Sequence, residues 1–172
     1  MSQAKLLHFT GTLEKSHNKL WGSHVRVPKA IAFRLVDPKS RRVIRTLNGS
    51  GEHQCALLPF GDGDFVLSVN KHWCDTLHLE IGSEVRVGLR KDNSKYGLPV
   101  PEELKELFRQ DKEGSRLFHA LTIGRQRTLL YIIGSLGSPD ARAWRASIVL
   151  RHLRENDGKI HYRELSRALK HR

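Results

Sequence analysis

The spacing of hydrophobic residues changes once along this chain, near Asp92, and this change restricts the fold more than any other feature. Before Asp92, apolar and polar residues alternate, as in strands with one buried face. Turn signals such as Asn48-Gly49 separate six runs, which cover residues 7–13, 25–27, 43–47, 55–58, 65–69 and 85–89. Short strands joined by tight turns predict a small β-barrel.

Part of this half repeats itself at a distance of 42 residues. Residues 25–47 superpose on residues 67–89 with five identities in 23 positions, among them Lys29 with Lys71 and Val43 with Val85. The shared pattern is a strand, a short helix and a strand. We therefore expect two similar halves that close a pseudo-twofold barrel within one chain.

After Asp92 the apolar residues follow the period of helices. Pro99 and Pro101 mark a linker, and the acidic pair after Pro101 suits a helix start. Further helices are expected near residues 117–121, after Thr122, after Ser138 and over 162–169. The chain is thus predicted to be α+β, with a β-barrel over residues 1–95 and a helical hairpin module with a basic tail over residues 96–172.

Positive charge is the strongest compositional signal. The 172 residues hold 30 Lys and Arg against 18 Asp and Glu, a net charge of +12. From Gly114 onward there are 12 basic and four acidic residues, and ten of the basic ones are Arg. Such a chain attracts polyanions, although the same charge also serves as a solubilising surface.

The longest apolar run, residues 129–133, is too short to span a membrane, and the first residues lack a signal-peptide pattern, so we expect a cytoplasmic protein.

Motifs of the common enzyme classes are missing from the sequence. It has no nucleophile elbow, no zinc-protease helix, no phosphate-binding P-loop and no dinucleotide fingerprint. Cys74 lies between His72 and Asp75, but neighbours this close on a short helix point to different sides. The Gly- and Asp-rich segment 61–64 reads as a hairpin turn rather than a calcium loop. Cys55 and Cys74 are expected to be half-buried thiols, and we predict no catalytic residue, metal or cofactor.

Seven arginines are the candidates for binding a polyanion. Arg125 and Arg127 lie where a helix is expected to begin, and Arg142 and Arg145 lie at the start of the next helix beside Trp144. Alternatively, Arg142 and Arg145 tie the helices to the barrel through salt bridges. Trp21 and Trp73 are interpreted as barrel core rather than as platforms for bases. The remaining candidates, on the barrel, are Arg41, Arg42 and Arg45.

Several short stretches together resemble a known bacterial family. In the first half they include Phe9-Thr10-Gly11-Thr12-Leu13-Glu14, Leu57-Leu58-Pro59-Phe60-Gly61-Asp62-Gly63 and Tyr96-Gly97-Leu98-Pro99; in the second, Gly124-Arg125-Gln126-Arg127 and Ser138-Pro139-Asp140-Ala141-Arg142. The second half resembles the YdeI or OmpD-associated family, also called bacteriocin-protection proteins. The first half resembles the domain of unknown function that often precedes it. The resemblance implies a double-split β-barrel similar to the AbrB and MazE class of DNA-binding barrels, followed by helices.

These observations lead to one main functional hypothesis and two rivals. The main one is a non-enzymatic cytoplasmic protein that binds a polyanion, in the first place nucleic acid, through an arginine-rich face. The first rival is a stress or bacteriocin-protection adaptor that binds a protein or peptide. The second rival is an enzyme with a pocket between barrel and helices.

Overall fold

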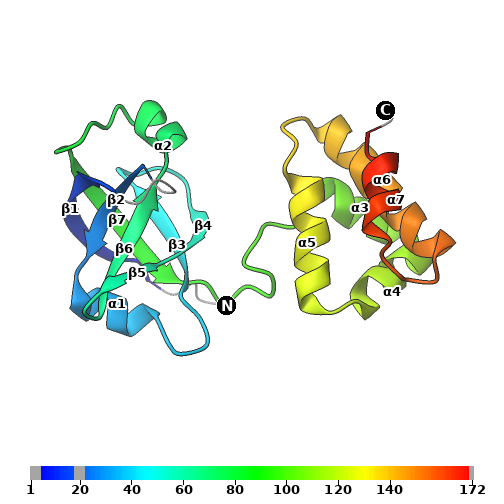
Figure 1. Cartoon of the computed structure of the whole chain (residues 1–172), viewed down its shortest axis with the longest axis horizontal. Coiled ribbons are helices and arrows are strands. Elements are labelled where there is room, and N and C mark those ends of the chain that lie inside the picture. Colours follow the sequence, from blue (N-terminus) through cyan, green and yellow to red (C-terminus); the bar gives the residue numbers. More distant parts are fainter. Residues whose placement is uncertain (1–4, 18–21, 171–172) are drawn as a thin grey trace. The chain divides into compact units, whose positions relative to one another are not determined.

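The structure, a computed structural model, describes residues 5–17 and 22–170. Contacts divide the chain into two compact units, Met1–Gly97 and Leu98–Arg172, which are described separately here. The first unit is a curled antiparallel sheet and the second is built from helices (Figure 1). The predicted α+β class is therefore confirmed.

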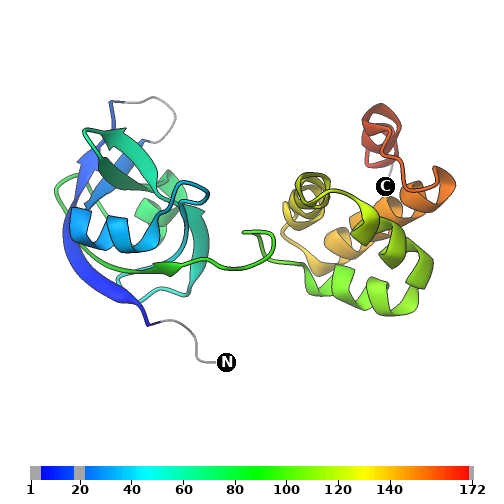
Figure 2. The same cartoon turned by 90° about the horizontal axis from the view of Figure 1, so that it is seen from below.

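Seven strands form the sheet of the first unit, and every pairing between them is antiparallel. Their order is β4-β3-β7-β1-β2-β6-β5. Strands β4 and β5, at the two ends of this order, are separated in sequence only by Leu57. One continuous segment therefore pairs with β3 through β4 and with β6 through β5, and this closes the curled sheet (Figures 1 and 2). The run expected as one strand at 55–58 spans this junction. The strands are β1 (Leu7–Lys15), β2 (Ser23–Val27), β3 (Arg42–Leu47), β4 (His53–Ala56), β5 (Leu58–Gly61), β6 (Asp64–Val69) and β7 (Glu84–Lys91).

The internal repeat predicted from the sequence is present in the barrel. Strand β2, helix α1 (Lys29–Leu35) and β3 correspond to β6, helix α2 (Lys71–Thr76) and β7. Val25 lies opposite Leu67, and Thr46 lies opposite Gly88. Each of these pairs joins residues 42 positions apart, so a pseudo-twofold axis passes through both. The axis places α1 and α2 at opposite ends of the barrel (Figure 1).

Alternate side chains of the strands fill the barrel. Val25, Val43, Val85 and Leu89 are fully buried, in keeping with the period of two. Strand β3 alternates buried and half-buried residues, and its buried set is Val43, Arg45 and Leu47. An arginine therefore occupies a position on the core side of the sheet.

The Gly- and Asp-rich segment forms the expected hairpin turn. Gly61 pairs with Asp64, and the two residues between them, Asp62 and Gly63, have φ angles of 51° and 75°. Left-handed backbone at both central positions fits the twist of a two-residue hairpin, and Asp-Gly is a preferred pair there. The segment thus serves to connect β5 to β6.

Five helices form the second unit, with α6 at its centre. Helix α6 packs against α3, α4, α5 and α7, and a short loop over residues 135–138 makes α5 and α6 antiparallel neighbours. The side chains of Thr122 and Ser138 accept backbone N–H groups at the starts of α5 and α6, as predicted. Among the described residues, no helix is long and apolar enough to cross a membrane. The bounds are α3 (Glu102–Gln110), α4 (Lys112–Ala120), α5 (Ile123–Gly134), α6 (Pro139–Glu155) and α7 (Tyr162–Ala168).

Candidate functional site

The first turns of α6 hold two of the candidate arginines in contacts within the helical unit. Arg142 donates from Nε and Nη2 to the two carboxylate oxygens of Glu103 on α3, at 3.1 and 2.7 Å. Its Nη1 donates to the carbonyls of Leu136 and Gly137, at 3.2 and 3.1 Å. A guanidinium engaged on all three nitrogens joins the start of α6 to α3 and to the loop between α5 and α6.

Arg145 serves the C-terminus of α5. Its Nη1 donates to the carbonyl of Ile132 at 2.7 Å and to the hydroxyl of Ser135 at 2.9 Å. The last carbonyls of a helix have no partner within the helix, so a cation there is favourable. The alternative considered for Arg142 and Arg145 was a tie to the barrel, whereas the partners found here all belong to the helical unit.

Arg125 and Arg127 are different, because both are exposed and neither is in an ion pair with a described residue. They lie in the first turns of α5, where the free backbone N–H groups and the positive end of the helix dipole add to their charge. Since α5 and α6 are antiparallel, this pair lies towards the other end of α5 from the partners of Arg145, Ile132 and Ser135, roughly 12 Å along the helix axis. The four arginines therefore do not form one cluster.

A hollow of about 430 Å³ borders the start of α5, and Arg125 is part of its wall. Two further arginines line it, but Arg116 is paired with Glu113 at 2.7 Å and Arg154 with Asp111 at 2.9 Å. Asp157 also lines the hollow, so its wall carries charges of both signs. Arg125 is the cation in this wall that no described carboxylate neutralises.

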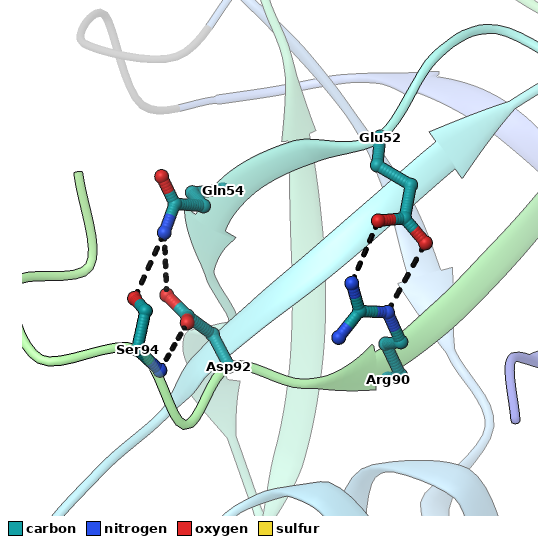
Figure 3. A network of polar contacts seen from close by, with 5 residues as sticks. All are labelled: Glu52, Gln54, Arg90, Asp92 and Ser94. Carbon is teal, nitrogen blue, oxygen red and sulfur yellow. Dashed lines mark hydrogen bonds and ion pairs between the residues drawn. The ribbon is translucent and has the colours of Figure 1, made fainter. Parts of the chain in front are cut away.

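On the barrel, Arg41 is exposed, while Arg42 is engaged close to the end of the unit. Arg42 Nη2 donates to the carbonyl of Ser94 at 2.7 Å. The neighbouring polar network fixes the same segment: Gln54 donates to Ser94 Oγ at 2.9 Å, and buried Asp92 accepts the backbone N–H of Ser94 (Figure 3). This network anchors the chain after β7, and its only signal in the sequence is the presence of polar residues at a strand end.

The same face of the sheet carries an ion pair next to this network. Arg90 Nε and Nη2 donate to the two carboxylate oxygens of Glu52, at 3.1 and 2.6 Å (Figure 3). Arg90 holds the pKa of the Glu52 carboxyl below its usual range. The charges of Arg90 and Glu52 therefore neutralise each other within the barrel.

Arg45 is buried rather than presented on the surface. Its side chain lies on the inner face of β3, where it contacts the face of Trp73 at 5.2 Å from guanidinium carbon to ring centre. The period-two pattern of Val43, Arg45 and Leu47 already places Arg45 on the core side, a signal that the surface-binding hypothesis did not use. Arg45 is therefore not available to a nucleic-acid backbone running over the barrel.

The two cysteines and Asp75, for which the sequence predicted no catalytic role, make contacts within the barrel unit. Both cysteines are free and half-buried, as predicted, and burial raises the pKa of the Cys55 thiol to about 11. Cys74 contacts Ser23 Oγ at 3.5 Å, whereas neighbouring Asp75 pairs with Lys71. No group of three metal-ligating side chains occurs among the described residues.

The tryptophans divide between the two units and the undescribed part of the chain. Trp73 is half-buried and packs against the barrel core, as expected for a core residue. Trp144 is also half-buried. Trp21 lies outside the described residues.

Fold and charge together define a class of protein: a basic, two-unit α+β chain with an antiparallel barrel before a helical bundle. Residues 9–89 match a family model described as a domain of unknown function, DUF1905. Residues 98–156 match the family described as bacteriocin-protection, YdeI or OmpD-associated. The two matches follow one another in the order that the sequence indicated, and the resemblance is confirmed. No curated protein matches the chain.

Proposed function

We propose that this chain is a non-enzymatic, cytoplasmic binding protein whose ligand is a polyanion, in the first place nucleic acid. The contact surface is the region around the start of α5. The observation that carries the proposal is the pair Arg125 and Arg127, exposed at a helix N-terminus and in no ion pair with a described residue. Arg142 and Arg145 support the fold and are not part of this surface.

The charge distribution of the helical unit supports the choice of surface. Six of its carboxylates are engaged in ion pairs with nearby Lys or Arg residues: Glu102, Glu103, Glu106, Asp111, Glu113 and Glu155. The uncompensated cations therefore dominate the field that a ligand meets. Besides Arg125 and Arg127, they include Arg163 and Arg167 on α7, which are exposed one helical turn apart and which the sequence reasoning did not single out.

Fluorescence anisotropy with labelled duplex and single-stranded DNA tests the proposal. At low salt, near 50 mM, the full chain should bind both, and Arg125→Gln/Arg127→Gln should weaken binding at least tenfold. A matched control is Arg34→Gln/Lys39→Gln, which removes the same charge from exposed positions of the barrel unit. The control should retain most of the affinity.

Two results would contradict the proposal. One is no binding of either DNA at low salt. The other is equal weakening in the two double variants, because affinity would then follow net charge and not a particular surface.

The adaptor hypothesis remains the second candidate, favoured by the description of the family that residues 98–156 match. It requires one protein partner in fixed stoichiometry. A pulldown in which such a partner survives nuclease treatment, together with absent DNA binding in the anisotropy experiment, would favour it over the polyanion.

A further inference from the structure

Three side chains that carry or can acquire positive charge gather around the ring of Trp73 at one end of the barrel. The guanidinium of Arg45 lies 5.2 Å from the ring centre, and the rings of His53 and His72 lie 4.3 and 5.6 Å from it. Arg45 comes from β3, His53 is directly opposite it on β4, and His72 belongs to α2. Both histidines are exposed, whereas Arg45 is only 6% exposed.

The internal repeat shows that the fold does not need this arrangement. Forty-two residues separate equivalent positions, so Val87 corresponds to Arg45 and Ile31 corresponds to Trp73. The position of His72 is taken by Ala30. Val87 is buried in the apolar core and Ile31 packs against that core. One end of the barrel is thus closed by small and aliphatic side chains, and the other end has a cation, an imidazole and an indole in their place.

The charge of Arg45 is not balanced within the barrel. Among the described residues it is in no ion pair; its Nη1 donates to the carbonyl of Ser68 at a long 3.5 Å, and its buried Nε has no acceptor. Two carboxylates on neighbouring segments are engaged elsewhere: Glu52, just before β4, pairs with Arg90, and Asp75 on α2 pairs with Lys71. A buried guanidinium without a counter-charge is costly, and an anion bound to its N–H groups would lower that cost.

We propose that Arg45, His53 and His72 form a binding site for a tetrahedral oxyanion such as a phosphate group. Arg45 supplies the permanent charge and a fork of N–H donors, and the two exposed imidazoles close over the bound group. Trp73 holds the guanidinium in place from the side of α2. This site goes beyond the proposed surface on α5, since it lies in the barrel unit and accepts a single group rather than a strand.

His53 makes the site sensitive to pH. The charged and titratable groups facing it are Arg45 from β3, His53 and Cys55 from β4, and His72 from α2. Burial, then Arg45 and then His72, lowers the pKa of His53, which disfavours its imidazolium form. A bound anion favours the imidazolium, and affinity rises as pH falls.

A titration followed by NMR tests the site on the full Arg125→Gln/Arg127→Gln variant, so that its outcome does not depend on the surface at α5. The signals observed are the indole N–H of Trp73 and the Nε–H of Arg45. Sodium phosphate should shift both, and chloride at the same ionic strength should not. His53→Ala/His72→Ala should weaken the effect at least tenfold, whereas His8→Ala/His161→Ala, a matched pair of exposed histidines, should leave it unchanged.

Sulfate separates the pH effect from the titration of phosphate, because its own charge stays constant near neutrality. Its affinity should be higher at about pH 6 than at about pH 8. Shifts caused equally by chloride, or unaltered in His53→Ala/His72→Ala, would overturn the proposal. A further arm uses a single-stranded oligonucleotide, which should shift neither signal at phosphate-group concentrations where inorganic phosphate does, because Arg45 is buried. Equal or larger shifts with the oligonucleotide would contradict a site for a single group.

Discussion

At the scale of single residues, Arg142 and Glu103 illustrate how a basic side chain is committed to the fold. Their side chains are only 25% and 16% exposed, and two hydrogen bonds join them across α6 and α3. Arg142 holds the pKa of the Glu103 carboxyl below its usual range. The pair therefore stabilises the fold above the ordinary carboxyl pKa, and the contribution is lost as pH falls through the lowered value.

Glu103→Gln should accordingly lower Tm at neutral pH. The deficit relative to the unsubstituted chain should shrink as pH falls below the ordinary carboxyl pKa and through the lowered pKa of folded Glu103. Glu102→Gln is the matched control, since it lies in the same turn of α3 but is largely exposed and paired only with Lys105. Thermal unfolding followed by circular dichroism measures both. A deficit in Glu103→Gln that is independent of pH would contradict this account.

Arg45 represents the opposite case, a residue that the fold tolerates rather than needs. Arg45→Leu replaces the unpaired cation by an aliphatic side chain, as Val87 does at the equivalent position. We expect Tm to rise by about 4–8 °C, the change that ~1 kcal/mol causes in a small domain, while the phosphate-dependent NMR shift of Trp73 is lost. A fall in Tm would show that Arg45 is structural.

At the scale of elements, the pseudo-twofold axis brings β3 and β7 together at Thr46 and Gly88. A Cβ atom on Gly88 would lie 2.6 Å from Thr46 Oγ1 and 3.0 Å from the ring of His8. Gly88→Ala should therefore destabilise the barrel by about 1–3 kcal/mol. Because the first obstacle is a side-chain oxygen, adding Thr46→Ala should restore part of the loss.

Urea unfolding of Gly88→Ala, Thr46→Ala and the double variant measures this coupling as a double-mutant cycle. Gly51→Ala is a control, since a Cβ there meets no atom within 4 Å. Additive effects of the two substitutions would show that the contact between β3 and β7 at this point is not tight.

The elements themselves were largely predictable from local patterns. The 42-residue repeat located β2, α1, β3 and their counterparts, and Thr122 and Ser138 marked the starts of α5 and α6. The fate of the arginines was not predictable, because it depends on partners distant in sequence. Arg142 finds Glu103 only after α3 and α6 have packed, and no local pattern reports that contact.

At the scale of the whole molecule, the net charge of +12 overstates the positive charge that a ligand can reach, because several arginines are bound or buried within the fold. Arg42, Arg142 and Arg145 bind carbonyls or carboxylates of their own unit, and Arg45 is buried. These four arginines therefore do not contribute to the single arginine-rich face that was expected from the sequence. In the function we propose, the ligand contacts the cations that remain free, above all those at the start of α5.

The salt dependence of DNA binding tests this claim most directly. For each phosphate neutralised, the slope of log K against log salt concentration changes by about 0.9 on duplex DNA. Arg125→Gln/Arg127→Gln should make the slope shallower by roughly two units, and Arg34→Gln/Lys39→Gln should leave it nearly unchanged. Equal slopes for the full chain and the Arg125→Gln/Arg127→Gln variant would contradict the proposed contact surface.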